Sequence, residues 1–163
     1  MKQLEDLYKR DQYHIKRWEK NYSDKEFYKI NKEIRKELEI ILKKNKKLTP
    51  RDHFLIAIIY QHGFTISSSK KALRYAKLAV EKGYKKGKWL IASATDRLLQ
   101  LQGKSQKFGT QLIIKNKRLK QYKTDRSITD EIRKEYGLPT LKQLKRHHET
   151  HKLKEAYIRN NNL

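Results

Sequence analysis

The sequence predicts a mainly α-helical protein, a compact bundle of about six to seven helices in a single domain over residues 1–163. Two observations lead to this prediction. Apolar residues recur at helical spacing in several segments, and helix-capping residues stand just before some of them. The length of 163 residues suits one domain. Hydrophobic residues make up only 36% of the chain, but ten Tyr, four Phe and two Trp can fill a thin core.

The first two predicted helices are amphipathic. Residues 2–20 place their apolar side chains near one face. Ser23 and Glu26 have the spacing of a capping box, which opens a second helix that runs to about Lys46. The polar face of this second helix is rich in Lys and Glu, and we expect it to be solvated.

The third predicted helix is the central one. Thr49 suits the N-cap and Pro50 the first turn. Residues 54–60 are apolar on all sides, which predicts a helix buried on most of its surface. The helix ends at Q-H-G, where Gly63 suits a left-handed terminating residue.

A helix pair follows. Ser68 or Ser69 can cap its first helix, which has a face of small residues before Gly83, and the second helix starts after Gly87 and ends at Gly103. The A-x-x-A-x-x-x-G pattern resembles a hairpin of the tetratricopeptide or Sel1 type. There is no second copy at a period of 34 to 40 residues, so an extended solenoid is excluded.

The remaining elements are shorter. Residues 111–123 can form one small β-hairpin. A short helix is predicted at residues 128–136, where it stops at Gly137. A basic C-terminal helix is predicted at about 140–160.

The chain is strongly basic. It carries 41 Lys and Arg against 18 Asp and Glu, a formal net charge of +23. The excess is spread along the chain, with about +6 in residues 1–48, about +9 in 49–112 and about +8 in the rest. Such a surface attracts polyanions, which include RNA, DNA, acidic proteins and phosphorylated substrates. Charge alone does not select among these partners.

Two further features restrict the chemistry and the location. The chain has no cysteine, which excludes disulfides, thiolate catalysis and cysteine-ligated zinc. Its start, M-K-Q-L-E-D-L-Y, lacks the apolar core of a signal peptide, and no run approaches the ~18 apolar residues of a membrane span. We therefore expect a cytoplasmic protein with no membrane partner, and we predict neither a metal nor a cofactor.

His62 is the first candidate site residue. It follows Gln61 at the C-terminal end of the buried helix, where the negative end of the helix dipole favours a protonated imidazole. Such a residue can accept a proton or bind phosphate. It can also simply bond to the backbone, and the residue on its own favours that structural role.

Asp96 and Arg97 form the second candidate. They lie on a helix rich in small residues, where burying an acid and an arginine costs several kcal/mol unless both are paired. One interpretation is an internal ion-pair network. The other is that Arg97 binds an anionic ligand while Asp96 orients His62 or Arg97.

The segment from Gly103 to Gln111, G-K-S-Q-K-F-G-T-Q, is the third candidate. It holds two glycines, two glutamines, two lysines and two hydroxyls. Backbone N–H groups and lysines in such a loop can bind phosphate. The loop has neither the G-x-x-x-x-G-K-[ST] spacing nor the preceding strand of a P-loop, so a polar connector is the alternative.

Together these motifs resemble a widespread, largely uncharacterised bacterial family, a domain of unknown function. Its members read DQ, QH(G or A), DR, GxxQxYGTQ and RxxxGL in chain order. The corresponding residues here are 11–12, 61–63, 96–97, 103–111 and 133–138. The resemblance covers about residues 8–140. Phe108 replaces the usual Tyr, and no Arg stands soon after the DQ pair. The resemblance implies a shared fold and site, but no established reaction.

Two histidines near the end of the chain have the spacing of metal ligands. His147 and His151 lie four residues apart on the last predicted helix. Glu149 lies between them, so the pattern is not H-E-x-x-H, and the segment is rich in Lys and Arg. A solvated basic face is the better interpretation, and no metal site is predicted.

The first function that these features indicate is a polar pocket. It would bind, and hydrolyse or transfer, an anionic ligand that contains a phosphate or an amide. His62 would be the general acid or base, Asp96 its orienting group and Arg97 the stabiliser of negative charge. The ligand-binding residues would be Asp11, Gln12, Gln61, Gln106, Lys107, Gly109, Thr110 and Gln111.

The alternative is a module that binds RNA or DNA through basic faces, with Tyr84 and Tyr122 available for stacking on bases. The basic stripes would be Lys70-Lys71, Lys85-Lys86-Lys88, Lys115-Lys117-Arg118-Lys120 and Lys142-Lys145-Arg146. A third function is that of a helical adaptor for acidic proteins. An enzyme that acts on RNA or nucleotides would combine the first two.

Overall fold

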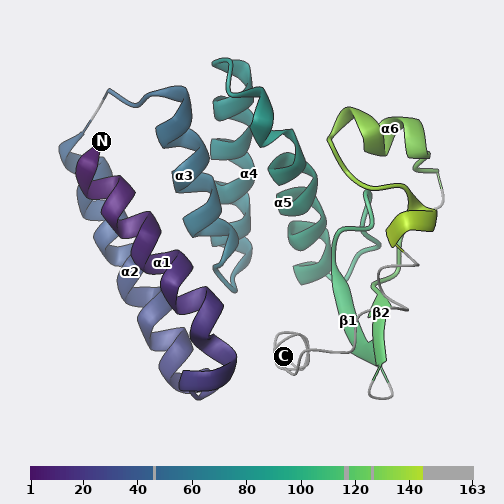
Figure 1. The fold of residues 1–163 in the computed structure, drawn as a ribbon, viewed down its shortest axis with the longest axis horizontal. Helices are drawn as coiled ribbons and strands as arrows, with labels where there is room; N and C mark the ends of the chain where they lie inside the picture. The colour runs from purple at the N-terminus through teal and green to yellow at the C-terminus, as the bar shows by residue number, and fades with distance from the viewer. Residues whose placement is uncertain (46, 116–117, 126, 145–163) are drawn as a thin grey trace.

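The structure, a computed structural model, describes residues 1–45, 47–115, 118–125 and 127–144. It is mainly helical, as the sequence predicts. The helices α1 to α5 lie side by side, and the strands and a short helix lie beyond α5 (Figure 1). The elements are α1 (Lys2–Asn21), α2 (Asp24–Lys44), α3 (Pro50–Gln61), α4 (Ile66–Glu81), the 3-10 turn η1 (Lys85–Gly87), α5 (Lys88–Leu101), β1 (Leu112–Lys115), β2 (Arg118–Gln121) and α6 (Asp130–Glu135).

Most of the predicted C-terminal helix, at about 140–160, lies outside the described residues, as do His147 and His151. Within the described part of the chain, no helix is both long and apolar enough to cross a membrane.

The starts of α2 and α3 follow from local hydrogen bonds. Ser23 and Glu26 form the predicted capping box, in which the Ser23 N–H donates to the Glu26 carboxylate at 2.8 Å. Thr49 and Asp52 form a second box, with a Thr49 N–H to Asp52 distance of 2.9 Å. These reciprocal bonds satisfy N–H groups that have no partner inside a helix.

α3 is the centre of the main core. It contacts α1, α2, α4 and α5, which explains why it is apolar on all sides. Ile56 and Ile59 are fully buried, in one cluster with Leu4 of α1 and Leu38 of α2. The periodic apolar faces of α1 and α2 therefore meet on the α3 surface.

α4 and α5 pack against each other as the predicted helix pair. The alanines on the α4 face, Ala72, Ala76 and Ala79, are fully buried. Their small side chains let the neighbouring helices approach closely. Tyr75 covers the edge of this face, and its ring stacks on Tyr60 of α3 with 5.9 Å between the ring centroids.

Two predicted helix ends are wrong in detail. α4 is capped by Thr65, whose hydroxyl accepts the Ser68 N–H at 3.1 Å, so Ser68 and Ser69 lie buried in the first turn. Thr65 has the extended backbone that an N-cap requires. Gly63 does not have a positive φ. It is needed because a Cβ there would overlap the Ser68 side chain.

β1 pairs with β2 in antiparallel register, with Leu112 opposite Gln121 and Lys115 opposite Arg118. The residues that join the strands, 116–117, lie outside the described part. α6 starts after Thr129, whose hydroxyl accepts the Ile132 N–H.

A second, smaller core joins this part of the chain to α5. It consists of Ala92, Phe108 and Ile128, against which Ile132, Tyr136 and Leu138 pack. The Phe108 and Tyr136 rings lie 4.6 Å apart. The loop before β1 and the helix α6 therefore share one apolar anchor on α5.

His53 is a titratable group buried in α3. It is 7% exposed, stacks on Tyr75 and has no hydrogen-bond partner for Nδ1 among the described residues. Burial lowers the pKa of His53, and the charge of Lys82 lowers it further, while Asp52 acts in the opposite direction. The folded chain therefore holds this proton less tightly than the unfolded chain does.

We expect His53 to make the protein less stable in mild acid. A pKa that is lower in the folded state contributes stability above the unfolded pKa, near 6.5, and this stability is lost as the pH falls through the folded pKa. The unfolding free energy, measured with urea between about pH 7 and about pH 5, should fall more steeply in the native chain than in His53→Phe, which keeps a ring against Tyr75. Equal slopes would show that His53 does not cause the pH dependence.

Candidate functional site

α1 and the end of α3 bring Asp11 and His62 together. The Asp11 side chain is 1% exposed and that of His62 is 22% exposed. His62 Nδ1 lies 2.7 Å from Asp11 Oδ2, and Gln12 Nε2 donates to the same carboxylate oxygen at 3.2 Å. A carboxylate in this position orients the ring and favours the tautomer with the proton on Nδ1. Nε2 has no hydrogen-bond partner among the described residues, so it can accept a proton.

The orienting group of His62 is therefore Asp11 and not Asp96, which corrects the sequence prediction. Asp11 lies 51 positions before His62. The predicted pairing joined two residues of the central motifs, but His62 at the end of α3 contacts the middle of α1 instead.

α2 supplies two polar residues that the sequence analysis missed. Asn31 is 1% exposed, and Arg35 Nη1 donates to Asn31 Oδ1 at 3.3 Å. Burial lowers the pKa of Arg35, whereas the charges of Asp11 and Tyr60 act to raise it. The Arg35 guanidinium therefore lies within electrostatic reach of the Asp11 carboxylate.

The sequence analysis gave neither residue a role. The signal was present in the spacing, because Asn31 falls in the helical series of Phe27, Ile34 and Leu38, all of which are buried. A polar residue inside an apolar stripe indicates a buried polar contact.

Gln61, the neighbour of His62, connects the Asp11–His62 pair (the dyad) to α5 and to the loop at residues 103–111. Its Nε2 donates to Ser93 Oγ at 3.1 Å. Gln111 Nε2 lies 3.3 Å from the Ser93 carbonyl oxygen and 3.1 Å from Thr110 Oγ1. The side-chain oxygen of Gln61 is buried and has no hydrogen-bond partner among the described residues. Gln61 therefore links the end of α3 to Ser93 of α5.

Arg97 lies four residues after Ser93 on α5, which places both on one face of the helix. It is half-buried. This face of α5 also carries the contact with Gln61, so the predicted anion-binding arginine belongs to the same region as the end of α3.

Asp96 is the centre of a hydrogen-bonded cradle. It is fully buried, and its Oδ1 accepts the N–H groups of Lys107 at 2.7 Å and Phe108 at 2.8 Å. Its Oδ2 accepts the N–H and the hydroxyl of Thr110, both at 2.8 Å. The backbone N–H groups that the sequence analysis considered for phosphate binding are therefore directed at a side chain of the protein itself.

Gln106 completes the fold of the loop. It is fully buried, and its Oε1 accepts the Gln111 N–H at 2.8 Å. The two N–H groups of its Nε2 lie within hydrogen-bonding distance of the carbonyl oxygens of Gln111 and Tyr122 and of Thr124 Oγ1. All of its side-chain hydrogen-bonding groups have internal partners. Gln106 thus joins the loop to the segment after β2.

Arg133 holds the other side of the same loop. It is 1% exposed, its Nε donates to the Pro139 carbonyl oxygen at 2.8 Å, and its Nη1 donates to the carbonyl oxygen of Phe108. Gly109 has φ +73° and packs against Arg133 and Gln121. The sequence analysis quoted this arginine only as part of a motif and gave it no role.

The predicted site residues thus fall into two hydrogen-bonded groups that meet at Gln61 and His62. One is the dyad with Gln12. The other is the loop scaffold of Asp96, Gln106, Gly109 and Thr110, reached through Gln111 and Ser93. Lys107 contributes its backbone to the scaffold, and its exposed ammonium lies 5.5 Å from the Phe108 ring centroid.

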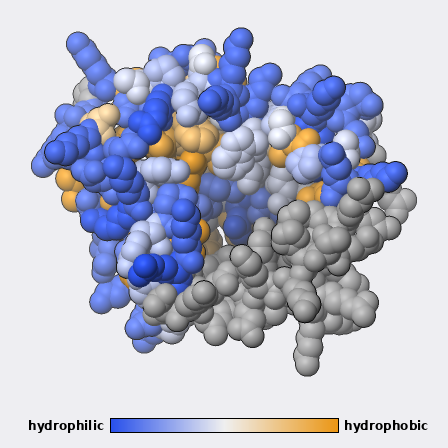
Figure 2. Space-filling model, viewed as in Figure 1, coloured by the Kyte–Doolittle hydropathy of each residue, from blue (hydrophilic) through white to orange (hydrophobic). Residues whose placement is uncertain are grey.

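Hydrophilic residues dominate the face in Figure 2, and hydrophobic residues reach it only in small patches. Two grooves lie elsewhere, one between α1 and α2 and one on α4 and α5, and neither is lined by a predicted site residue. In the part of the chain that the structure describes, no group of three or more His, Asp or Glu residues could hold a metal ion.

The chain matches no family model, and no curated protein or solved structure is similar to it at a significant level. The resemblance to the bacterial family with the DQ, QH, DR and GxxQxYGTQ motifs therefore stays a prediction from the residues themselves.

Proposed function

We propose that the protein binds an anionic ligand containing a phosphate or an amide beside His62 and that His62 transfers a proton in its hydrolysis or group transfer. One observation carries this proposal: the buried Asp11 carboxylate bonds to Nδ1 of a partly exposed imidazole whose Nε2 has no partner among the described residues. Nucleophiles are activated by this arrangement in many hydrolases.

The chemistry follows from the dyad. His62 Nε2 would take a proton from water or from a substrate hydroxyl, and the Asp11 carboxylate would stabilise the imidazolium that forms. The same imidazolium would then give its proton to the leaving group. Arg35 and Arg97 are the cations suited to balance charge on the substrate.

The test uses three simple substrates: bis(p-nitrophenyl) phosphate, p-nitrophenyl phosphate and p-nitroacetanilide. We expect the native protein to hydrolyse at least one of them, and we expect Asp11→Asn and His62→Gln to lower kcat/KM by roughly 10²- to 10⁴-fold. His14→Gln is the matched control, because His14 is a half-buried histidine of α1 that bonds to Tyr22 rather than to a carboxylate.

Binding is measured separately by NMR. Titration with inorganic phosphate should shift the His62 ring resonances in the native protein and leave those of His14 in place. Turnover that survives in His62→Gln, or turnover of none of the three substrates, would contradict the catalytic proposal. A failure of phosphate to shift His62 would contradict the anion site.

A second candidate, binding of RNA or DNA through basic faces, is favoured by the exposed lysines at the turn between α4 and α5, Lys85, Lys86 and Lys88. Tyr84 beside them packs on Phe54 with 4.8 Å between ring centroids, so its ring is already occupied. Affinity for an oligouridylate should fall steeply between low and physiological salt if phosphates are the contacts. A flat salt response would argue against this candidate.

A further inference from the structure

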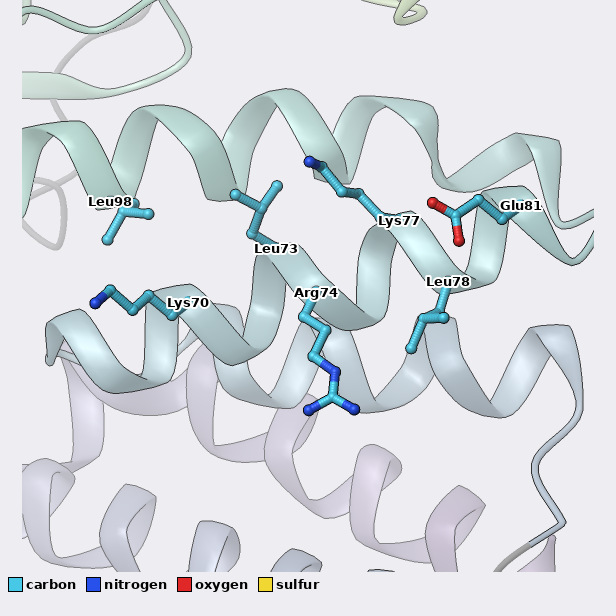
Figure 3. Close-up of a pocket in the computed structure, with 7 residues that line it drawn as sticks. All are labelled: Lys70, Leu73, Arg74, Lys77, Leu78, Glu81 and Leu98. Atoms are coloured by element: carbon cyan, nitrogen blue, oxygen red, sulfur yellow. The ribbon is translucent and has the colours of Figure 1, made fainter.

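The outer surface of α4 has a groove of about 440 Å³ with an unusual mixture of side chains. Three cations, Lys70, Arg74 and Lys77, share it with three leucines. Figure 3 shows that all but one of the lining residues come from α4 and that Leu98 comes from α5. The single acid in the lining is Glu81.

Helical spacing explains the mixture. Residues 70, 74, 77 and 81 follow each other at intervals of three or four, so they form one stripe along the exposed side of the helix. The alanine face of α4 is fully buried on the opposite side. Half-buried Leu73 and Leu78 flank the stripe, with Leu73 directed toward α5 in Figure 3.

The charge of the groove restricts what can occupy it. A second copy of this chain carries a net charge of +23, and the C-terminal residues 145–163 carry more Lys and Arg than Asp and Glu. Both would be repelled by the three cations. The occupant must therefore be acidic.

The leucines distinguish between acidic occupants. Binding of single-stranded nucleic acid relies on planar side chains on which bases stack, and the groove lining includes no aromatic ring. Leucines beside a charged stripe instead match the apolar anchors of an amphipathic protein segment. The stripe from Lys70 to Glu81 covers about three helical turns, or about 16 Å.

We propose that this groove is a docking surface for an acidic amphipathic helix of another protein. Apolar residues of the partner contact Leu73, Leu78 and Leu98, and its Asp or Glu side chains face the α4 cations. The surface excludes the residues of the Asp11–His62 site, so this proposal is independent of the proposed catalytic function.

The experiment uses a fluorescein-labelled synthetic helix of roughly 16 residues with leucines at every third or fourth position and glutamates between them. Its affinity for the full chain is measured by fluorescence anisotropy. We expect the triple variant K70Q/R74Q/K77Q to bind it roughly tenfold more weakly than the native protein does. The matched control K85Q/K86Q/K88Q removes the same charge from another exposed surface and should bind within about twofold.

Two further arms separate shape from charge. A peptide of the same composition with its leucines scattered around the helix should bind several-fold more weakly. The double variant Leu73→Ala/Leu98→Ala should have a lower affinity for the amphipathic peptide and an unchanged affinity for the scattered peptide. The proposal is overturned if the native chain does not bind the amphipathic peptide, or if both triple variants lower the affinity for this peptide equally. It is overturned too if the scattered peptide binds with the same affinity as the amphipathic one. It is also overturned if K70Q/R74Q/K77Q loses binding of an oligouridylate but not of the peptide.

Discussion

Asp96→Asn is expected to lower the unfolding free energy by about 3–5 kcal/mol, because it removes a buried charge that four donors share. Those donors are the N–H groups of Lys107, Phe108 and Thr110 and the Thr110 hydroxyl. An asparagine has one acceptor oxygen, so its NH₂ group would face N–H donors at the other position. Urea or guanidinium denaturation measures the loss.

Asp125→Asn is the matched control for this prediction. Asp125 is exposed, and its Oδ1 accepts the Ser127 N–H at 2.9 Å, a bond that an asparagine oxygen can still make. Its effect on the unfolding free energy should be far smaller than that of Asp96→Asn. If the two variants changed stability equally, Asp96 would not be the centre of the loop scaffold.

Gly109→Ala is expected to lower the unfolding free energy by more than Gly103→Ala, which should lower it by only about 1–2 kcal/mol. Both glycines have nearly the same positive φ, +73° and +70°, so the backbone strain is matched. At Gly103 an added Cβ meets nothing within 4 Å. At Gly109 it would overlap the Gln121 amide and lie 3.1 Å from Arg133 Nη1.

The difference between the two alanine variants therefore measures how the Gln121 and Arg133 side chains pack against the loop, and not the preference of glycine for positive φ. Thermal or chemical unfolding of the two proteins gives this difference directly. Equal losses would mean that the Arg133 and Gln121 side chains move aside at little cost.

These predictions bear on the candidate site because the loop scaffold positions Gln111. Gln111 lies directly after the cradle, and its side chain reaches Ser93, which also binds Gln61. A loosened loop would thus disturb the α5 side of the site while leaving the Asp11–His62 bond intact. Loop variants and dyad variants should therefore differ in their effects on stability.

The sequence by itself determined the local structure of this protein. The capping box at Ser23 and the N-cap at Thr49 depend on residues within four positions, and the apolar pattern at 54–60 indicates burial on every side of a helix. These features can therefore be predicted without knowing the fold. The helix pair at α4 and α5 follows from alanine spacing in the same way.

Tertiary structure alone decided how the polar residues pair. Asp96 and Asp11 were both available to His62, and sequence spacing does not say which of two helices meets the end of α3. The backbone N–H groups of the loop could have faced a ligand or a buried carboxylate with the same local sequence. Hydrogen bonds between residues far apart in the chain depend on how helices pack, and packing is set by the whole apolar surface rather than by any one motif.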